Sequence, residues 1–205
     1  MMRPQLIEPG AVPADPLALL ADAGARLAAA AADRRAAMHA PVVVTADADA
    51  RIMVLRAADA DFAGLRFHTD ARAPKVATIT ADPRMTILAY DPAARVQLRM
   101  TGTAHIEAKG AVADAAWTAA SPLSRRCYLA ETGPSAALDR PGSALPQHLV
   151  GQRPSLAESE AGRGVFAVIV VRIETLDWLR LDATGGLRAK FARTDAGWAG
   201  EWIAP

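Results

Sequence analysis

Hydrophobic and polar positions alternate most regularly between residues 96 and 107. Every second residue from Val96 to Ile106 is apolar apart from Gly102, and the positions between, from Gln97 to His105, are polar. A period of two is typical of a strand with one buried and one solvated face. This stretch therefore predicts a long β-strand that lies against a core.

Shorter runs of the same kind fill much of the remaining chain. They are rich in β-branched and apolar residues and are separated by turn-forming residues. The runs ADADA (46–50) and AADADFAG (57–64) have the composition of hairpin connections, so we expect antiparallel neighbours. The predicted strands cover residues 42–45, 52–57, 65–69, 85–90, 96–107, 165–173, 176–181, 187–193 and 198–203.

A few segments have helical character instead. Leucines at helical spacing follow Asp15 and Pro16, which predicts a first helix that continues to Ala37 and is stopped by Pro41. Shorter helices are predicted over 73–80, 111–120 and 124–130. Many short antiparallel strands with a few helices predict a mainly β (α+β) fold, an antiparallel barrel with accessory helices.

Residues 1–205 are expected to form one domain, because a chain of this length can bury a single core. Residues 1–14 are rich in proline and predict a disordered lead. Residues 131–164 are rich in Pro, Gly and Ser and predict a long loop, which in a compact domain is usually functional or mobile.

Composition narrows the possible partners. A formal net charge of +1 gives no reason to expect a nucleic acid or a membrane held by bulk electrostatics, and no apolar run is long enough to cross a bilayer. Cys127 is the only cysteine, which excludes an internal disulfide and a cysteine-based metal cluster. No metal-binding spacing of His or carboxylates is present, and the N-terminus lacks an export signal, so we expect a cytoplasmic protein.

Basic residues after the predicted third strand are a candidate anion site. Thr69 ends that strand, and Arg72 and Lys75 lie at the start of the short helix that follows. Free backbone N–H groups and the positive end of a helix dipole favour a phosphate there. Solvated surface charges are the alternative interpretation of such a pair.

Several ordered motifs resemble the pyridoxamine 5′-phosphate oxidase family. The family patterns are R-x-V-L-L-K, V-F-Y-T-N, a basic pair that opens a helix, N-P-R at its end, and R-Q-V-x-V-x-G. This chain has Arg51–Arg56, Leu65–Asp70, Lys75, Asp82–Arg84, and Arg95–Leu98 followed by Gly102. Its ending, from Arg188 to Pro205, is similar to the family's D-R-F … W … R-L-A-P. The resemblance implies an antiparallel split β-barrel that binds FMN, as a homodimer with the cofactor at the subunit interface.

The resemblance also implies roles for individual residues. Arg51 and the backbone of 52–55 would contact the flavin ring and phosphate, and Arg72 and Lys75 would hold the phosphate. Gln97 would reach the ring from the partner subunit, and Lys190 stands where the family has an arginine. The implied cofactor-binding residues are Arg51, Ile52, Met53, Val54, Leu55, His68, Thr69, Arg72, Lys75, Gln97 and Lys190.

The positions that bind substrate in the family have changed together. The lysine, tyrosine, arginine and serine of the family fall on Arg56, Trp117, Ser121 and Arg125, and its R-x-H motif falls on Gly186 and Arg188. Candidate substrate-binding residues are therefore Arg56, Trp117, Arg125 and Arg188. Arg125, Arg126 and Arg188 form either a rearranged anion site or scattered surface charges.

The expected function is that of an FMN-dependent oxidoreductase related to pyridoxamine 5′-phosphate oxidase, acting on an unassigned small molecule. In this class the flavin carries the redox chemistry, so no catalytic triad is expected. Two alternatives stay open. One is an FMN carrier or sensor without turnover, favoured by the changed substrate positions. The other is a split-barrel reductase that uses FMN or the deazaflavin F420.

Overall fold

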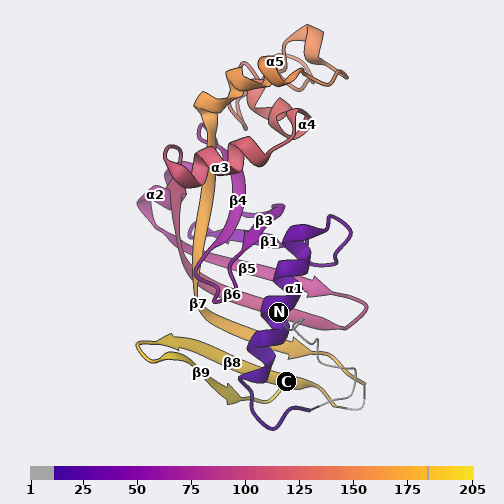
Figure 1. The fold of residues 1–205 in the computed structure, drawn as a ribbon, viewed down its shortest axis with the longest axis vertical. Helices are drawn as coiled ribbons and strands as arrows, with labels where there is room; N and C mark the ends of the chain where they lie inside the picture. Colours follow the sequence, from indigo (N-terminus) through magenta and orange to yellow (C-terminus); the bar gives the residue numbers. More distant parts are fainter. Residues whose placement is uncertain (1–11, 184) are drawn as a thin grey trace. The chain divides into compact units, whose positions relative to one another are not determined.

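The computed structural model describes residues 12–183 and 185–205. The predicted disordered lead, residues 1–14, falls mostly outside the described residues. The helices are α1 (Ala18–Ala32), α2 (Pro74–Ala81), α3 (Ala111–Ala119), α4 (Pro122–Arg125) and α5 (Leu156–Glu160). The strands are β1 (Val42–Thr45), β2 (Ala50–Ile52), β3 (Leu55–Ala58), β4 (Leu65–Asp70), β5 (Arg84–Asp91), β6 (Val96–Glu107), β7 (Phe166–Arg180), β8 (Leu187–Thr194) and β9 (Gly197–Trp202) (Figure 1).

Within the described residues, nine strands form one sheet in the order β2-β1-β5-β6-β7-β4-β3, with β8 paired to β7 and β9 paired to β8. The pairs β1–β2, β1–β5, β3–β4, β5–β6, β7–β8 and β8–β9 are antiparallel. The strand predicted over 96–107 is confirmed as β6. Its apolar positions Val96, Leu98 and Met100 are buried, as the alternation requires.

The chain divides into two compact units. Unit 1 takes its described residues from Met1–Phe67, Asp82–Ala104 and Val170–Pro205, and unit 2 consists of His68–Ala81 and His105–Ile169. The prediction of a single domain stays a prediction. No helix in the described part of the chain is both long and apolar enough to cross a membrane.

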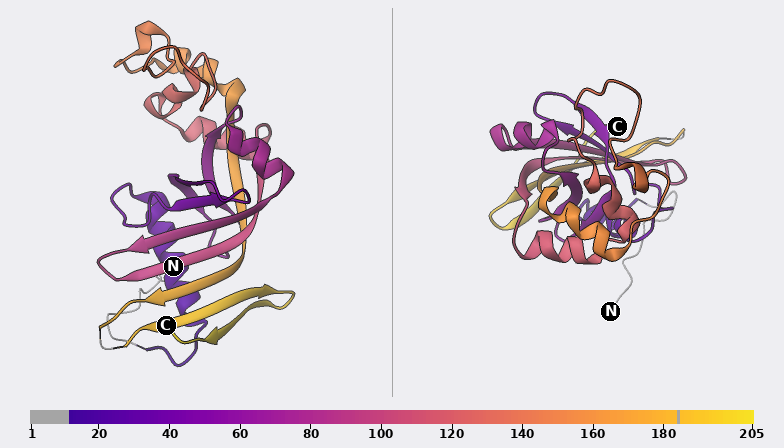
Figure 2. Two further views of the ribbon diagram at one scale, coloured as in Figure 1. Left: turned by 180° about the vertical axis from the view of Figure 1, so that it is seen from behind. Right: turned by 90° about the horizontal axis from the view of Figure 1, so that it is seen from above.

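In unit 1, helix α1 covers one face of the sheet (Figures 1 and 2). A buried polar cluster fixes the helix there. The carboxylate of Asp22, which is fully buried, accepts hydrogen bonds from Trp178 Nε1 and from Arg26 Nε, each at 2.8 Å. Arg26 also donates to Asp91 at 2.8 Å. Among the described residues α1 is the only helix of unit 1, so no helix of this unit covers the opposite, outward face.

Unit 2 is built around aromatic side chains. The ring of Phe166 lies 5.1 Å from the rings of Trp117 and Tyr128 and 4.9 Å from that of His68, centre to centre. Such edge-on and tilted arrangements are the ones that aromatic quadrupoles favour. These contacts form the core of the unit.

Several predictions about elements need correction. The first helix ends at Ala32 rather than Ala37, because the backbone of Asp33 is extended, and the strands predicted over 165–173 and 176–181 form the single strand β7. The run 52–57 is not one strand, because the chain changes partners within it. β2 pairs with β1 and β3 pairs with β4, while the N–H groups of Met53 and Leu55 donate to Pro41 and His39. The segment 131–164 is not a plain loop, because it contains α5 and short 3₁₀ turns. A capping box between Ser155 and Glu158 begins α5.

Candidate functional site

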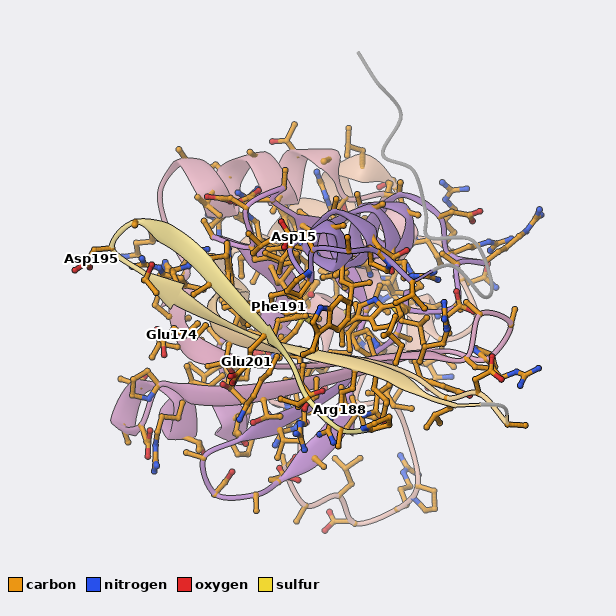
Figure 3. All side chains as sticks on the ribbon, turned by 90° about the horizontal axis from the view of Figure 1, so that it is seen from below. Asp15, Glu174, Arg188, Phe191, Asp195 and Glu201 are labelled. Atoms are coloured by element: carbon orange, nitrogen blue, oxygen red, sulfur yellow. The ribbon has the colours of Figure 1, made fainter. Side chains whose placement is uncertain are left out.

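The outward face of the sheet in unit 1 gathers polar residues from β6, β7 and β8. Arg99 on β6 donates to Asp177 on β7 at 2.5 Å, and Asp177 lies opposite Lys190 on β8. Gln97 lies two residues before Arg99 on the same face of β6. Arg188, labelled in Figure 3, lies two residues before Lys190 on β8. Two residues implied to contact flavin, Gln97 and Lys190, therefore belong to one surface.

Asp177 is the buried centre of this surface. Its side chain is 5% exposed, and Arg188 donates to both carboxylate oxygens at 3.0 and 2.8 Å. Burial alone would raise the pKa of Asp177, but the hydrogen bonds from Arg188 and Arg99 outweigh it and lower the pKa. Arg188, a candidate substrate ligand, thus has an ion-pair partner within the unit, which it shares with Arg99.

Gln97 and Lys190 are more available. Gln97 is half-buried, and its amide makes no hydrogen bond within the described part of the chain. Lys190 is exposed and borders a pocket of about 410 Å³ whose other lining residues include Thr175, Glu201 and Ala199. An amide that can donate and accept, on the same sheet face as an ammonium group, suits the polar edge of a ring system.

Residues 51–55 connect β2 to β3. Ile52 is 72% exposed, Met53 and Val54 are half-buried, and Leu55 is fully buried. The guanidinium of Arg51 does not point away from the chain. It donates to Thr45 Oγ1 at 3.2 Å and pairs with the carboxylate of Asp49, which fixes it over the turn between β1 and β2.

The candidate phosphate ligands of unit 2 lie at the end of β4 and the start of α2. Thr69 is buried, Lys75 is half-buried and Arg72 is largely exposed. Arg72 is bound by the preceding Asp70, whose carboxylate accepts from Nε at 3.0 Å and from Nη2 at 2.7 Å. This hydrogen bonding raises the pKa of Arg72. His68 contributes its ring to the aromatic core.

The substrate candidates of unit 2 are engaged with one another. Arg125 is 3% exposed and lies over the ring of Trp117 at 4.5 Å, while its Nε and Nη2 donate to the Trp117 carbonyl at 3.1 and 2.6 Å. Glu160 accepts from Arg125 Nη1 at 2.5 Å and from Trp117 Nε1 at 3.0 Å. The Trp117 hydrogen bond is the main reason why the pKa of Glu160 is lowered.

The remaining candidates are dispersed. Arg126 donates to the carbonyl of Gln152 at 2.9 Å, within unit 2. Arg56 on β3 is exposed, with no hydrogen-bonded or charged partner among the described residues. Each of Arg125, Arg126 and Arg188 is therefore engaged inside its own unit. Asp70, Glu160 and Asp177 are not among the site residues predicted from the sequence. Each of these carboxylates pairs with an arginine that is, namely Arg72, Arg125 or Arg188 respectively.

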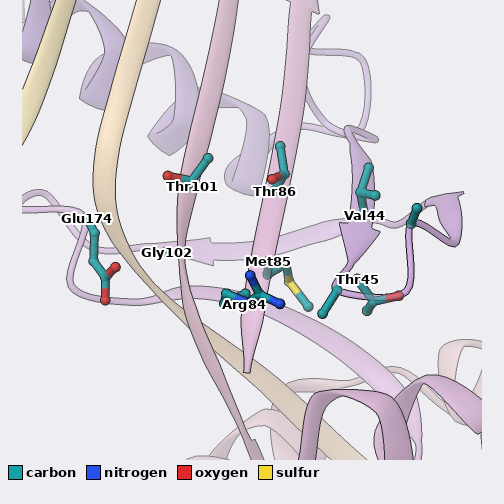
Figure 4. Close-up of a pocket in the computed structure, with 10 residues that line it drawn as sticks. Val44, Thr45, Arg84, Met85, Thr86, Thr101, Gly102 and Glu174 are labelled. Atoms are coloured by element: carbon teal, nitrogen blue, oxygen red, sulfur yellow. The ribbon is translucent and has the colours of Figure 1, made fainter. Parts of the chain in front are cut away.

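A second pocket of unit 1, of about 440 Å³, lies over β1, β5 and β6 (Figure 4). Thr86, Thr101 and Glu174 line it, with Arg84 at its rim. None of the residues implied for cofactor or substrate lines this pocket. Its floor includes Gly102, where a Cβ atom would lie 1.9 Å from the backbone oxygen of Arg172, so close approach of β6 and β7 requires glycine.

Solved structures share this fold. One is a pyridoxamine 5′-phosphate oxidase-related, FMN-binding protein from Nostoc punctiforme PCC 73102, with 22% identity and a TM-score of 0.67 over 89% of this chain and 96% of that one. Another is PhzG from Burkholderia lata 383, in complex with tetrahydrophenazine-1-carboxylic acid, with 16% identity and a TM-score of 0.66 over 94% of both chains. The fold is an antiparallel split β-barrel with accessory helices, as predicted.

One segment of the sequence also matches a family model. Residues 30–108 match the family model described as pyridoxamine 5′-phosphate oxidase, FMN-binding domain. No curated protein sequence matches the chain. The resemblance to the pyridoxamine 5′-phosphate oxidase-related family is thereby confirmed over the matched segment, which contains β1 to β6.

Proposed function

We propose that this protein binds FMN and uses it as an oxidoreductase on a small molecule. The observation that carries the proposal is the match of residues 30–108 to an FMN-binding domain. The outward sheet face supports it, because Gln97 and Lys190 lie on one surface there and Lys190 borders a hollow of about 410 Å³. The flavin would supply the redox chemistry.

The residues of this chain would bind and orient the cofactor. The Lys190 ammonium and, from the partner subunit, the Gln97 amide would contact the polar edge of the ring, where a positive charge favours a developing anion. Thr69 and Lys75 would hold the phosphate with the N–H groups at the start of α2. The segment that connects β2 to β3 would contact the flavin ring through Arg51 and the backbone of Ile52, Met53, Val54 and Leu55. His68, next to Thr69, would continue that contact.

A homodimer is part of this proposal. The outward face carries apolar side chains in water, with Ile52 72%, Tyr90 43% and Leu88 36% exposed. Leu88 lies opposite Arg99, and Tyr90 lies opposite Gln97, so this apolar area adjoins the polar surface around Asp177. Contiguous exposed apolar surface is typical of an interface. Light scattering at micromolar concentration should give twice the chain mass, and a monomer would contradict the dimer.

A carrier or sensor without turnover is the second candidate. The observation that favours it is the engagement of Trp117 and Arg125 with each other and with Glu160, since both substitute for substrate-binding residues. A side chain that is 3% exposed and fully hydrogen-bonded has no donor left for a substrate.

Anaerobic reduction of the flavin-loaded protein separates these functions. An oxidoreductase of this kind should lose its flavin absorbance when a suitable electron donor is added and regain it in air. Bleaching by pyridoxamine phosphate would indicate oxidase activity, and bleaching by NADPH would indicate a reductase. A loaded protein that no amine or nicotinamide donor bleaches, at any concentration tested, would contradict the oxidoreductase and favour the carrier.

A further inference from the structure

Three arginines of the chain share one local arrangement. Each follows an aspartate by two residues, and in each pair Nη2 of the arginine is bound to the carboxylate. The pairs are Asp49–Arg51, Asp70–Arg72 and Asp82–Arg84. Two of these arginines, Arg51 and Arg72, are implied cofactor ligands, so the charge available to an anion near them is smaller than a count of basic residues suggests.

The pair at the start of α2 is the most firmly held. The side chain of Asp70 is 6% exposed, against 66% for Asp49 and 36% for Asp82. Its carboxylate accepts from the backbone N–H of Arg72 at 2.8 Å as well as from Nε and Nη2. The remaining guanidinium nitrogen, Nη1, donates to the carbonyl of Ala130 at 3.1 Å. Every nitrogen of the Arg72 side chain is therefore in use.

Asp70 also changes the electrostatics of the helix start. The family pattern V-F-Y-T-N ends on a neutral asparagine where this chain has Asp70. The Asp70 carboxylate lies at the end of β4, four residues before Pro74 begins α2, and its negative charge repels an anion that approaches the helix start. Asp70 and Arg72 together carry no net charge, so this pair attracts a phosphate, which carries about two negative charges at neutral pH, less than an unpaired arginine would.

We propose that Asp70 is a specificity-determining residue that limits how far the flavin phosphate contributes to binding. By holding Arg72 and by its own charge, it narrows the difference in affinity between FMN and riboflavin. The inference rests on the proposed flavin binding and assigns to Asp70 a role in choosing among flavins.

Titration of protein with FMN and with riboflavin, followed by quenching of flavin fluorescence, tests this role without any turnover. Asp70→Asn keeps an oxygen to accept the backbone N–H of Arg72 but removes the charge and releases the guanidinium. We expect FMN to bind about tenfold more tightly to this variant, the size of one charge-assisted hydrogen bond, and riboflavin to bind as before. Asp70→Ser, which also retains an oxygen that can accept the backbone N–H of Arg72, should shift the ratio in the same direction.

Asp82→Asn is the matched control, because its pair with Arg84 has the same spacing but an exposed arginine, 77% accessible. It should change neither affinity. The double variant Asp70→Asn/Arg72→Gln should return FMN affinity to the wild-type value, since it has the same net charge as the wild-type pair and no released guanidinium.

The outcomes separate this inference from the proposed function. If FMN and riboflavin bind but Asp70→Asn and Asp70→Ser leave the ratio of their affinities unchanged, the role of Asp70 is wrong and flavin binding stands. A double variant that binds FMN tenfold more weakly than wild type would show that Arg72 already holds the phosphate, which also overturns the inference. Binding of neither flavin by any of these proteins contradicts the proposed function and this inference with it.

Discussion

The outward sheet face of unit 1 and the aromatic core of unit 2 both contain residues implied for binding. The two regions differ in whether those side chains are accessible to a ligand. On the sheet face Gln97 has an unengaged amide and Lys190 is exposed beside a hollow. In unit 2 the aromatic ring of Trp117 is buried under Arg125, whose charge is met by Glu160. The residues of the sheet face that the resemblance implies for the cofactor are thus accessible, whereas those of unit 2 that it implies for a substrate belong to the core.

The difference has a physical basis. A strand on a sheet with one uncovered face presents every second side chain to solvent, so polar residues there need no internal partner. A guanidinium inside an aromatic core must have its donors satisfied, because an unpaired buried charge is costly. Arg125 and Trp117 accordingly form a self-contained structural cluster with Glu160.

The stability of the sheet depends most on the close approach of β6 and β7. Gly102→Ala should destabilise the protein by about 3 kcal/mol or more, because the added Cβ would overlap the backbone of Arg172, which cannot move aside as a side chain can. Urea denaturation measures the change. Gly142→Ala is the control, since no atom lies within 4 Å of a Cβ there. Equal stability of the two variants would show that β6 and β7 are not held this closely.

The cluster of unit 2 should behave as structure. Arg125→Ala should lower the free energy of unfolding by about 2–3 kcal/mol, through lost hydrogen bonds and the lost stacking on Trp117. Flavin affinity should stay within a factor of two. Arg140→Ala, at an exposed position of the 131–164 segment, should leave stability unchanged. A stable Arg125→Ala protein with impaired ligand binding would place Arg125 in a binding site after all.

Lys75 should act on the phosphate alone. Lys75→Ala should weaken FMN binding by roughly tenfold to a hundredfold, the value of one charge-assisted hydrogen bond, and riboflavin binding much less. Arg56→Lys should leave FMN affinity nearly unchanged, because that position corresponds to a substrate residue in the family. Titration with both flavins provides the measurement. An equal loss for FMN and riboflavin would remove Lys75 from the phosphate site.

The sequence predicted the regular elements well where one pattern dominated. β1 and β6 begin and end at the predicted residues, because unbroken β-branched or alternating runs leave no competing structure. It missed the break after Ile52, since the change of pairing partner is set by neighbours distant in sequence. Helix α5 was missed too, although the spacing of Ser155 and Glu158 is a capping-box signal.

The candidate site was predictable as a set of positions but not as a set of free groups. The aspartates two residues before Arg51 and Arg72 are visible in the sequence, and this spacing indicates local ion pairs. The pairing of Arg188 with Asp177, and of Arg125 with Glu160, joins residues 11 and 35 positions apart, and only the fold brings them together. The ion-pair partners of a charged residue must therefore be known before that residue is assigned to a ligand.

Binding of FMN by the purified protein tests the central claim most directly. The protein should show the absorbance of bound flavin as isolated or after incubation with FMN, and its Tm should rise with FMN concentration, because a ligand that binds only the folded state stabilises it by mass action. Thermal unfolding across a titration of FMN gives the answer. A colourless protein whose Tm does not change at saturating FMN would contradict the account.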